Sequence, residues 1–214
     1  MLTFGLMYEL SILHICLNHG IIKKLGGFQM IDHMLGKRLY FERLKQGLTL
    51  RHLARKTGVS FSNINRIEQG LVNPKKESLD KLMQVLHVKY RNNVLAERTM
   101  SDEITKMYNA VIFVNYNEAK VIARNLKKHE VNYMASPKFI DYLLVLFMYA
   151  QHVKDPDFPK DSFYQQCELL EPVMNDDQRD HFYLEKGLYL YLSNKREEAV
   201  TYLLKHVDEI KHEQ

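Results

Sequence analysis

Apolar and polar residues recur with the period of an α-helix along most of this chain, and a few glycines, prolines and asparagines interrupt the pattern. Thr49 and Ser60 each precede a short amphipathic stretch, at the position of a helix N-cap. Gly58 and Gly70 follow those two stretches, where helices commonly end. Residues 75–88 again have helical spacing. The pattern therefore predicts short helices joined by tight turns.

From residue 101 onward, the periodicity predicts six longer helices, near residues 102–114, 117–129, 137–152, 160–173, 177–192 and 195–211. The segments that begin at Asn115 and Asn194 look alike, and their alanines, Ala119 and Ala199, lie 80 positions apart, or two steps of 40. A period of this length predicts three stacked helix pairs. The alternative is a helical bundle without repeats.

Length and composition agree with a helical protein of one or two domains. The chain has 214 residues, of which 46% are hydrophobic, and it has only five prolines and nine glycines. We predict an all-α fold in four parts. These are an uncertain N-terminal extension over residues 1–29, a helix-turn-helix domain over 30–90, a linker or linker helix over 91–100 and a helical-repeat domain over 101–214.

The first 29 residues are apolar but unlike a membrane span or a signal peptide, because Glu9 and His14 interrupt the apolar run and no basic start precedes it. We therefore expect no membrane contact. One hypothesis is that the native protein begins at Met30 or Met34, since the codons for residues 25–27 can contain a ribosome-binding purine run. The alternative is an extra helix over residues 2–17 that packs on the body or on a partner.

Charge is distributed unevenly along the chain. Residues 35–90 contain 12 lysines and arginines against 4 aspartates and glutamates, a net charge of +8, whereas the whole chain carries +4. Positive charge is thus concentrated in the segment of short helices. This distribution favours a surface that binds the phosphates of double-stranded DNA.

Residues 35–90 resemble the Xre family, the helix-turn-helix domain of Cro and the phage repressors. The matching residues are Gly36-Lys37-Arg38-Leu39, Arg43, Gly47-Leu48-Thr49, Leu53-Ala54, Gly58-Val59-Ser60, Ile64, Arg66-Ile67-Glu68-Gln69-Gly70, Asn73-Pro74, Leu79 and Leu82. The resemblance implies a five-helix domain whose recognition helix enters the major groove. Leu50 departs from the family, which often has a DNA-contacting glutamine there, and Phe61 replaces a usual polar residue.

The recognition helix and its neighbours supply the candidate DNA contacts. Arginine pairs well with guanine and asparagine with adenine, and an aromatic ring can touch a thymine methyl. The candidates for base contact are Phe61, Ser62, Asn63 and Arg66. Those for phosphate contact are Thr49, Arg51, Lys75 and Lys76, near helix starts or the following loop. Packing within the domain is the alternative for Phe61, and simple solvation is the alternative for the lysines. The resemblance also implies a buried ion pair between Arg43 and Glu68 that joins the first and third helices.

The last predicted helix pair resembles a tetratricopeptide repeat at Leu184, Gly187, Tyr191, Ala199 and Leu203. An Xre domain followed by such an array resembles the peptide-pheromone regulators of Gram-positive bacteria, the Rgg and PlcR type. The resemblance implies quorum sensing by a homodimer whose array binds a short peptide on its concave face. By repeat register, the candidate peptide contacts are Tyr108, Met148, Gln151, His181 and Tyr191, with ordinary packing as the alternative.

Other function classes find less support in the residues. The alternative regulator is a phage-type repressor or an antitoxin whose C-terminal domain only dimerises or docks a protein. We see no nucleophile elbow, phosphate loop or paired catalytic carboxylates, and no metal-ligand spacing, so we expect neither an enzyme nor a cofactor. Cys16 and Cys167 do not make a disulfide framework, which fits a cytoplasmic protein.

Overall fold

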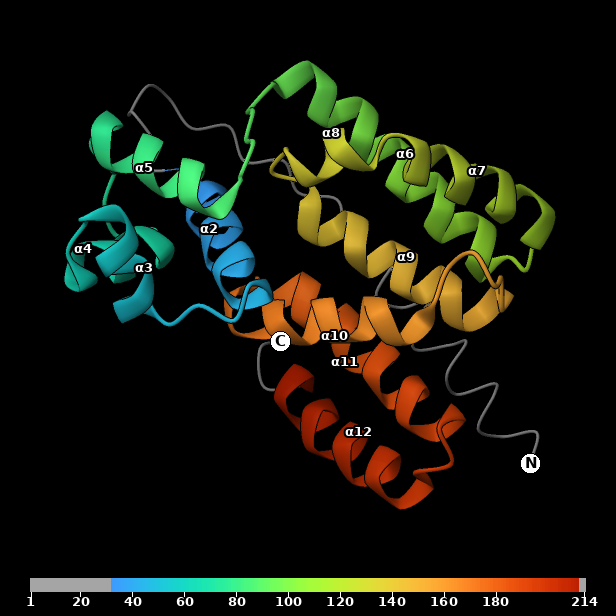
Figure 1. Ribbon diagram of the computed structural model, residues 1–214. Helices are drawn as coiled ribbons and strands as arrows, with labels where there is room; N and C mark the ends of the chain where they lie inside the picture. Colours follow the sequence, from blue (N-terminus) through green and yellow to red (C-terminus); the bar gives the residue numbers. More distant parts are fainter. Residues whose placement is uncertain (1–31, 212–214) are drawn as a thin grey trace.

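The computed structural model describes residues 32–211, and all regular elements in that part of the chain are helices (Figure 1). The predicted all-α fold is therefore confirmed. An N-terminal group comprises α2 (His33–Lys45), α3 (Leu50–Thr57), α4 (Phe61–Glu68) and α5 (Lys76–Leu86). A C-terminal group comprises α6 (Val94–Ile112), α7 (Tyr116–Lys128), α8 (Glu130–Met134), α9 (Phe139–Val153), α10 (Lys160–Leu170), the 3₁₀ turn η1 (Glu171–Val173), α11 (Asp176–Leu192) and α12 (Arg196–Lys211). The expectations for residues 1–29 lie outside the described residues.

The predicted caps shape the N-terminal group. Thr49 Oγ1 accepts a hydrogen bond from the His52 amide at 3.1 Å, and Ser60 Oγ accepts one from the Asn63 amide at 3.3 Å. Gly58 has φ +70°, a left-handed conformation that glycine adopts without strain, so the chain can turn sharply between α3 and α4. The helices enclose a small hydrophobic core. Its buried residues are Leu39, Leu53, Val59, Ile64, Ile67, Leu82, Leu86 and Val88.

The N-terminal group has four helices between residues 32 and 90, one fewer than the Xre resemblance implies. After α5, Val88 still fills the core, but the next helix begins only at Val94, inside the predicted linker, and runs on to Ile112. Asn93 explains this start, because its side chain accepts hydrogen bonds from the amides of Leu95 and Ala96. Residues 94–100, within the segment predicted as a linker or linker helix, are thus the first turns of α6.

The C-terminal group contains the three predicted helix pairs, α6 with α7, α9 with α10 and α11 with α12. The turns of the first and last pairs are alike. Val114 and Asn194 adopt φ of +58° and +63°, and the next amides, of Asn115 and Lys195, donate to carbonyls at 2.8 and 3.0 Å. These positions differ by 80 residues, so the repeat seen in the sequence is a repeat of turn geometry. The short helix α8 was not predicted.

Helix α9 lies at the centre of the C-terminal group and is buried on nearly all sides, from Phe139 to Gln151. It packs against α6 and α11 as well as against its own partner, α10. The first helices of the three pairs therefore form one layer with α9 in the middle.

Helix α2 belongs to both groups of helices and lies between them in Figure 1. Leu39 enters the N-terminal core, whereas Phe41, which is fully buried, enters the C-terminal core beside Phe139 at a ring distance of 6.1 Å. Arg38 Nε donates to the Met134 carbonyl at 2.6 Å, and its guanidinium lies over the Phe41 and Phe139 rings. The helix-turn-helix domain is therefore packed onto the C-terminal helices rather than tethered to them.

Two glycines allow close helix crossings. A Cβ atom on Gly36 would lie 2.3 Å from the Ile67 carbonyl oxygen, so α2 and α4 approach each other with no room for a side chain. A Cβ atom on Gly187 would clash with the Leu203 side chain, so α11 and α12 cross closely at this glycine.

Replacing Phe41 by alanine should destabilise the whole described fold. A buried phenylalanine truncated to alanine costs about 3–5 kcal/mol in the free energy of unfolding. Because Phe41 is carried by α2 but fills the C-terminal core, we expect thermal unfolding followed by circular dichroism to show one transition at a lower temperature. The matched control is Phe61→Ala, since Phe61 is 48% exposed and its truncation should leave the melting temperature nearly unchanged. Equal effects of the two substitutions would contradict this placement of Phe41.

Candidate functional site

Helix α4 separates its residues into a buried and an exposed face. Ile64, Ile67 and Glu68 are buried against the rest of the domain. Ser62 and Arg66 lie on the opposite, exposed face, since residues four apart on a helix share one side. Asn63 is half-buried at the edge of this face, and Asn65 is half-buried as well, so burial does not distinguish the two asparagines.

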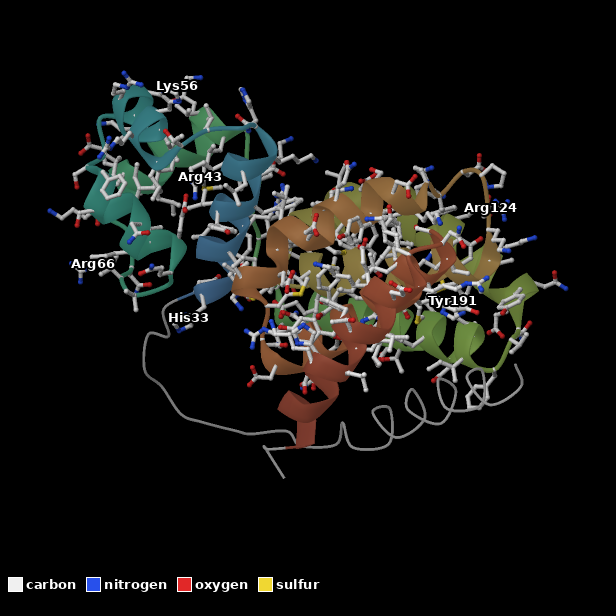
Figure 2. The ribbon with its side chains drawn as sticks, turned by 90° about the horizontal axis from the view of Figure 1, so that it is seen from below. His33, Arg43, Lys56, Arg66, Arg124 and Tyr191 are labelled. Carbon is white, nitrogen blue, oxygen red and sulfur yellow. The ribbon has the colours of Figure 1, made fainter. Side chains whose placement is uncertain are left out.

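Helix α4, the recognition helix that the Xre resemblance implies, lies on the outer edge of the molecule. In Figure 1, α3 and α4 lie on the side of the N-terminal group away from the C-terminal helices. Figure 2 shows Lys56 and Arg66 pointing outward from this edge, whereas Arg43 lies between helices. The face that carries Ser62 and Arg66 is therefore open to a large ligand.

Phe61 and two predicted phosphate contacts, Thr49 and Arg51, line one shallow hollow at the starts of α3 and α4. Leu50 lines the same hollow, at the position where the Xre family often has glutamine. The Phe61 ring is half-exposed rather than packed in the core. This places an apolar contact surface beside the amino ends of two helices, whose backbone amides favour anions.

Lys75 and Lys76 mark the start of α5 and are exposed. Lys75 occupies the N-cap position but makes no side-chain cap, so the first amides of α5 lack the partner that serine or aspartate would supply. Two cations beside a positive helix end are unfavourable by themselves. An incoming phosphate would satisfy both the amides and the lysines.

The buried ion pair between Arg43 and Glu68 is present and joins α2 to α4. Arg43 Nε and Nη2 donate to the two Glu68 carboxylate oxygens at 2.8 and 2.7 Å, and Nη1 donates to the Leu48 carbonyl at 2.9 Å. Burial raises the pKa of the Glu68 carboxyl, and the hydrogen bonds from Arg43 act in the opposite direction. The pair is structural, because it lies behind the exposed face of α4.

A second candidate site is a cavity of about 430 Å³ between α6, α9 and α11. Its lining residues are Ile104, Thr105, Tyr108, Asn109, Lys138, Asp141, Leu144, Met148, Asn175, Asp177, Gln178, His181, Leu184 and Glu185. Three of the five predicted ligand contacts, Tyr108, Met148 and His181, come together here, and Tyr108 is hydrogen-bonded to His181. Gln151 is buried outside the lining, and Tyr191 is 38% exposed elsewhere, beside Arg196.

One of the lining residues, Glu185, is a buried carboxylate. Gln151 Nε2 donates to its Oε2 at 2.6 Å, and the imidazoles of His152 and His181 lie 3.8 and 3.9 Å from its Oε1. Burial alone would raise the pKa of Glu185, but His152, His181 and Gln151 together hold it below its ordinary range. Burial lowers the pKa of His181, which favours its neutral form.

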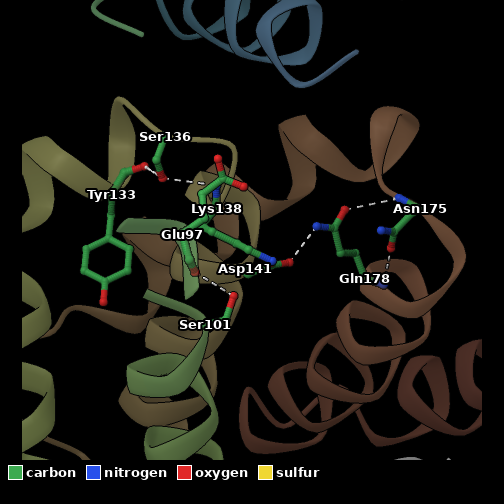
Figure 3. A network of polar contacts seen from close by, with 8 residues as sticks. All are labelled: Glu97, Ser101, Tyr133, Ser136, Lys138, Asp141, Asn175 and Gln178. Carbon is green, nitrogen blue, oxygen red and sulfur yellow. Dashed lines mark hydrogen bonds and ion pairs between the residues drawn. The ribbon is translucent and has the colours of Figure 1, made fainter. Parts of the chain in front are cut away.

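The charged residues of the cavity, chiefly Asp141, Lys138 and Glu185, were not among the site residues predicted from the sequence. Figure 3 shows hydrogen bonds running from Asp141 through Gln178 to Asn175, at the start of α11. A signal for Asp141 existed, because it is the only aspartate, glutamate, lysine or arginine in the apolar segment of α9. Glu185 shares a helix face with buried Gln178 and Phe182, a spacing that also marks it as unusual.

Within residues 32–211, no helix is both long enough and apolar enough to cross a membrane. The same part of the chain has no group of three or more side chains placed to hold a metal ion.

A family model described as helix-turn-helix matches residues 39–91, about a quarter of the chain, which includes α3, α4, α5 and most of α2. No curated protein and no solved structure matches the chain. The match supports the resemblance to Xre-type regulators. The chain thus carries a DNA-binding domain of the kind found in transcription regulators.

Replacing Glu68 by alanine should lower the urea concentration at which half of the protein is unfolded, because the Arg43 charge is then buried without its carboxylate. Breaking a buried pair in this way costs about 3–5 kcal/mol. The matched control is Glu77→Ala, which removes an exposed carboxylate paired with Lys81 at 2.6 Å and should leave urea unfolding unchanged. A Glu68→Ala protein as stable as the control would show that the pair contributes nothing to the fold.

Proposed function

We propose that this protein is a homodimeric, sequence-specific transcription regulator whose C-terminal helices bind a short peptide signal in the cavity between α6, α9 and α11. The observation that carries the proposal is the open face of α4, where Ser62 and Arg66 are exposed on a capped helix that faces away from the rest of the molecule. A helix of this kind enters the major groove with its amino end toward the bases.

The residues predicted to contact phosphates lie at the starts of the two helices next to α4 in the sequence. Thr49 and Arg51 lie at the start of α3, and Lys75 and Lys76 lie at the start of α5. All four are exposed, so they can approach the backbone on either side of a groove that holds α4. In a homodimer, two such helices would read half-sites about one helical turn apart.

The peptide part of the proposal is supported by the cavity and its lining. Ligand sites are typically concave, mostly apolar and provided with a few convergent polar groups. Leu144, Met148 and Leu184 supply apolar surface, whereas Tyr108 and Gln178 supply hydrogen-bonding groups. A peptide offers both apolar side chains and backbone amides to such a lining.

Replacing Arg66 by alanine should lower binding to a selected palindromic duplex more than binding to random DNA. Losing a good base contact costs about 1–3 kcal/mol, or about 5- to 150-fold in affinity. The duplex is first selected from a random library by the full-length protein, and its titration should give two chains per duplex. Affinities are then measured for both duplexes at one salt concentration.

The control for charge is Arg124→Ala, since Arg124 is an exposed arginine on α7, far from α4 in Figure 2. It removes the same charge and should leave both affinities unchanged. If Arg66→Ala weakens selected and random DNA equally, Arg66 contacts phosphate and its assignment to base readout is wrong. Failure of the full-length protein to select any sequence would contradict the proposal as a whole.

Replacing Lys75 and Lys76 together by alanine should weaken binding to all duplexes and flatten its dependence on salt. Each lost phosphate contact reduces the slope of log affinity against log salt by about 0.9. The charge-matched control is Lys120→Ala with Lys128→Ala, two exposed lysines of α7, which should not change the slope. An unchanged slope in the Lys75, Lys76 variant would show that both lysines are simply solvated.

A further inference from the structure

We infer that the cavity between α6, α9 and α11 selects a ligand with a positive charge on an apolar body. The inference rests on the proposed function in that it takes this cavity as the effector site, and it adds the charge of the ligand. For a peptide signal, the charge would be the terminal ammonium or a basic side chain.

The charge of the lining carries the inference. Three carboxylates, Asp141, Asp177 and Glu185, face one lysine, Lys138. His181 does not redress the balance, because burial favours its neutral form. Lys138 lies 3.4 Å from Asp141 and offsets one of the three carboxylates. Burial lowers the pKa of His152, but Glu185, 3.8 Å away, raises it above its ordinary value, so His152 offsets part of a second carboxylate. The lining still carries more negative than positive charge. A cation entering the cavity is therefore attracted, and an anion is repelled.

The amino end of α11 could also attract an anion, but side chains at this end already satisfy it. The start of α11 opens toward the cavity, and helix amino ends commonly bind anions. Here Asn175 and Gln178 form a capping box, in which each side chain accepts a hydrogen bond from the other residue's backbone amide, at 2.8 and 3.2 Å. Asp176 and Asp177 add negative charge to the first turn.

Asp141 is the carboxylate best placed to receive the cation. Its side chain is 28% exposed, so a ligand can reach it, whereas Glu185 is 1% exposed and is held by Gln151. Gln178 Nε2 donates to Asp141 Oδ1 at 2.6 Å and fixes the carboxylate, as Figure 3 shows. Its Oδ2, at 3.4 Å from Lys138, is the atom that a ligand ammonium would approach.

The apolar body of the ligand has a matching surface. Ile104, Leu144, Met148 and Leu184 come from all three helices of the layer and line the same cavity. A volume of about 430 Å³ lies within the range of small-molecule sites and fits a few side chains rather than a folded segment. An amphipathic cation satisfies both parts of the lining at once.

Three probes with the same aromatic body test the charge. Binding of 2-phenylethylamine, 2-phenylethanol and 3-phenylpropionate to the full-length protein is measured by calorimetry at pH 7. The amine should bind about tenfold more tightly than the alcohol, as expected for one charge-assisted hydrogen bond, and the carboxylate should bind most weakly. Asp141→Asn, which keeps an oxygen for Gln178, should reduce amine binding to the level of the alcohol and leave the alcohol unchanged.

The matched control is Asp161→Asn, since Asp161 accepts a hydrogen bond from Tyr189 outside the cavity and its substitution changes the net charge equally. It should alter none of the three affinities. Equal binding of the three probes, tighter binding of the carboxylate, or no binding at all would overturn the charge inference.

Two further probes separate this inference from the proposed function. Leucyl-leucine amide has a free ammonium, and its N-acetyl derivative does not. Binding of the free amine form alone supports both statements. If 2-phenylethylamine binds but neither dipeptide does, the peptide part of the proposed function fails while the preference for cations stands.

Discussion

The structure depends on one helix that packs in two directions. Leu39 and Phe41 are two positions apart on α2, so their side chains leave the helix about 200° apart. Leu39 fills the core of the helix-turn-helix domain, and Phe41 fills the core of the C-terminal helices. Gly36 and the Arg43–Glu68 pair then fix α4 against α2. The orientation of the recognition helix is thereby set relative to the whole molecule.

Charged side chains have opposite uses on the two sides of α4. Glu68 is buried, and its charge is matched by two hydrogen bonds from Arg43, so the pair specifies how two helices meet. Arg66, two positions earlier, is exposed. Both carboxylate oxygens of Glu68 accept hydrogen bonds from Arg43, whereas the exposed guanidinium of Arg66 keeps its donors available for the DNA contact predicted for it. Burial, rather than residue type, thus distinguishes the structural Glu68 from Arg66, the predicted base contact.

Local features of this fold could be predicted from the sequence, because they depend on neighbouring residues. The caps at Thr49 and Ser60, the left-handed turn at Gly58 and the similar turns at Val114 and Asn194 all depend on short-range chemistry. The burial of Phe41 in the C-terminal core could not be predicted, because its partner Phe139 is almost a hundred positions away. The same holds for the carboxylates of the cavity, which only the packing of α9 against α11 brings together. The DNA contacts themselves remain predictions.

The double role of α2 also restricts how a ligand could regulate DNA binding. A domain on a flexible linker can change its orientation freely. Here the Arg91 amide donates to the Ala135 carbonyl at 2.6 Å, and Arg38 donates to the Met134 carbonyl. These two hydrogen bonds connect the N-terminal group to the C-terminal group in addition to the chain itself. A ligand shifts an equilibrium only if it binds two arrangements differently. In this molecule, the two arrangements must differ either in the packing of α2 on the C-terminal helices or in the way two whole chains are placed together. Burial lowers the pKa of Lys37 on α2, and the charge of the Asp141 carboxylate opposes that shift, so a carboxylate of the cavity lies close enough to interact with the helix that orients α4.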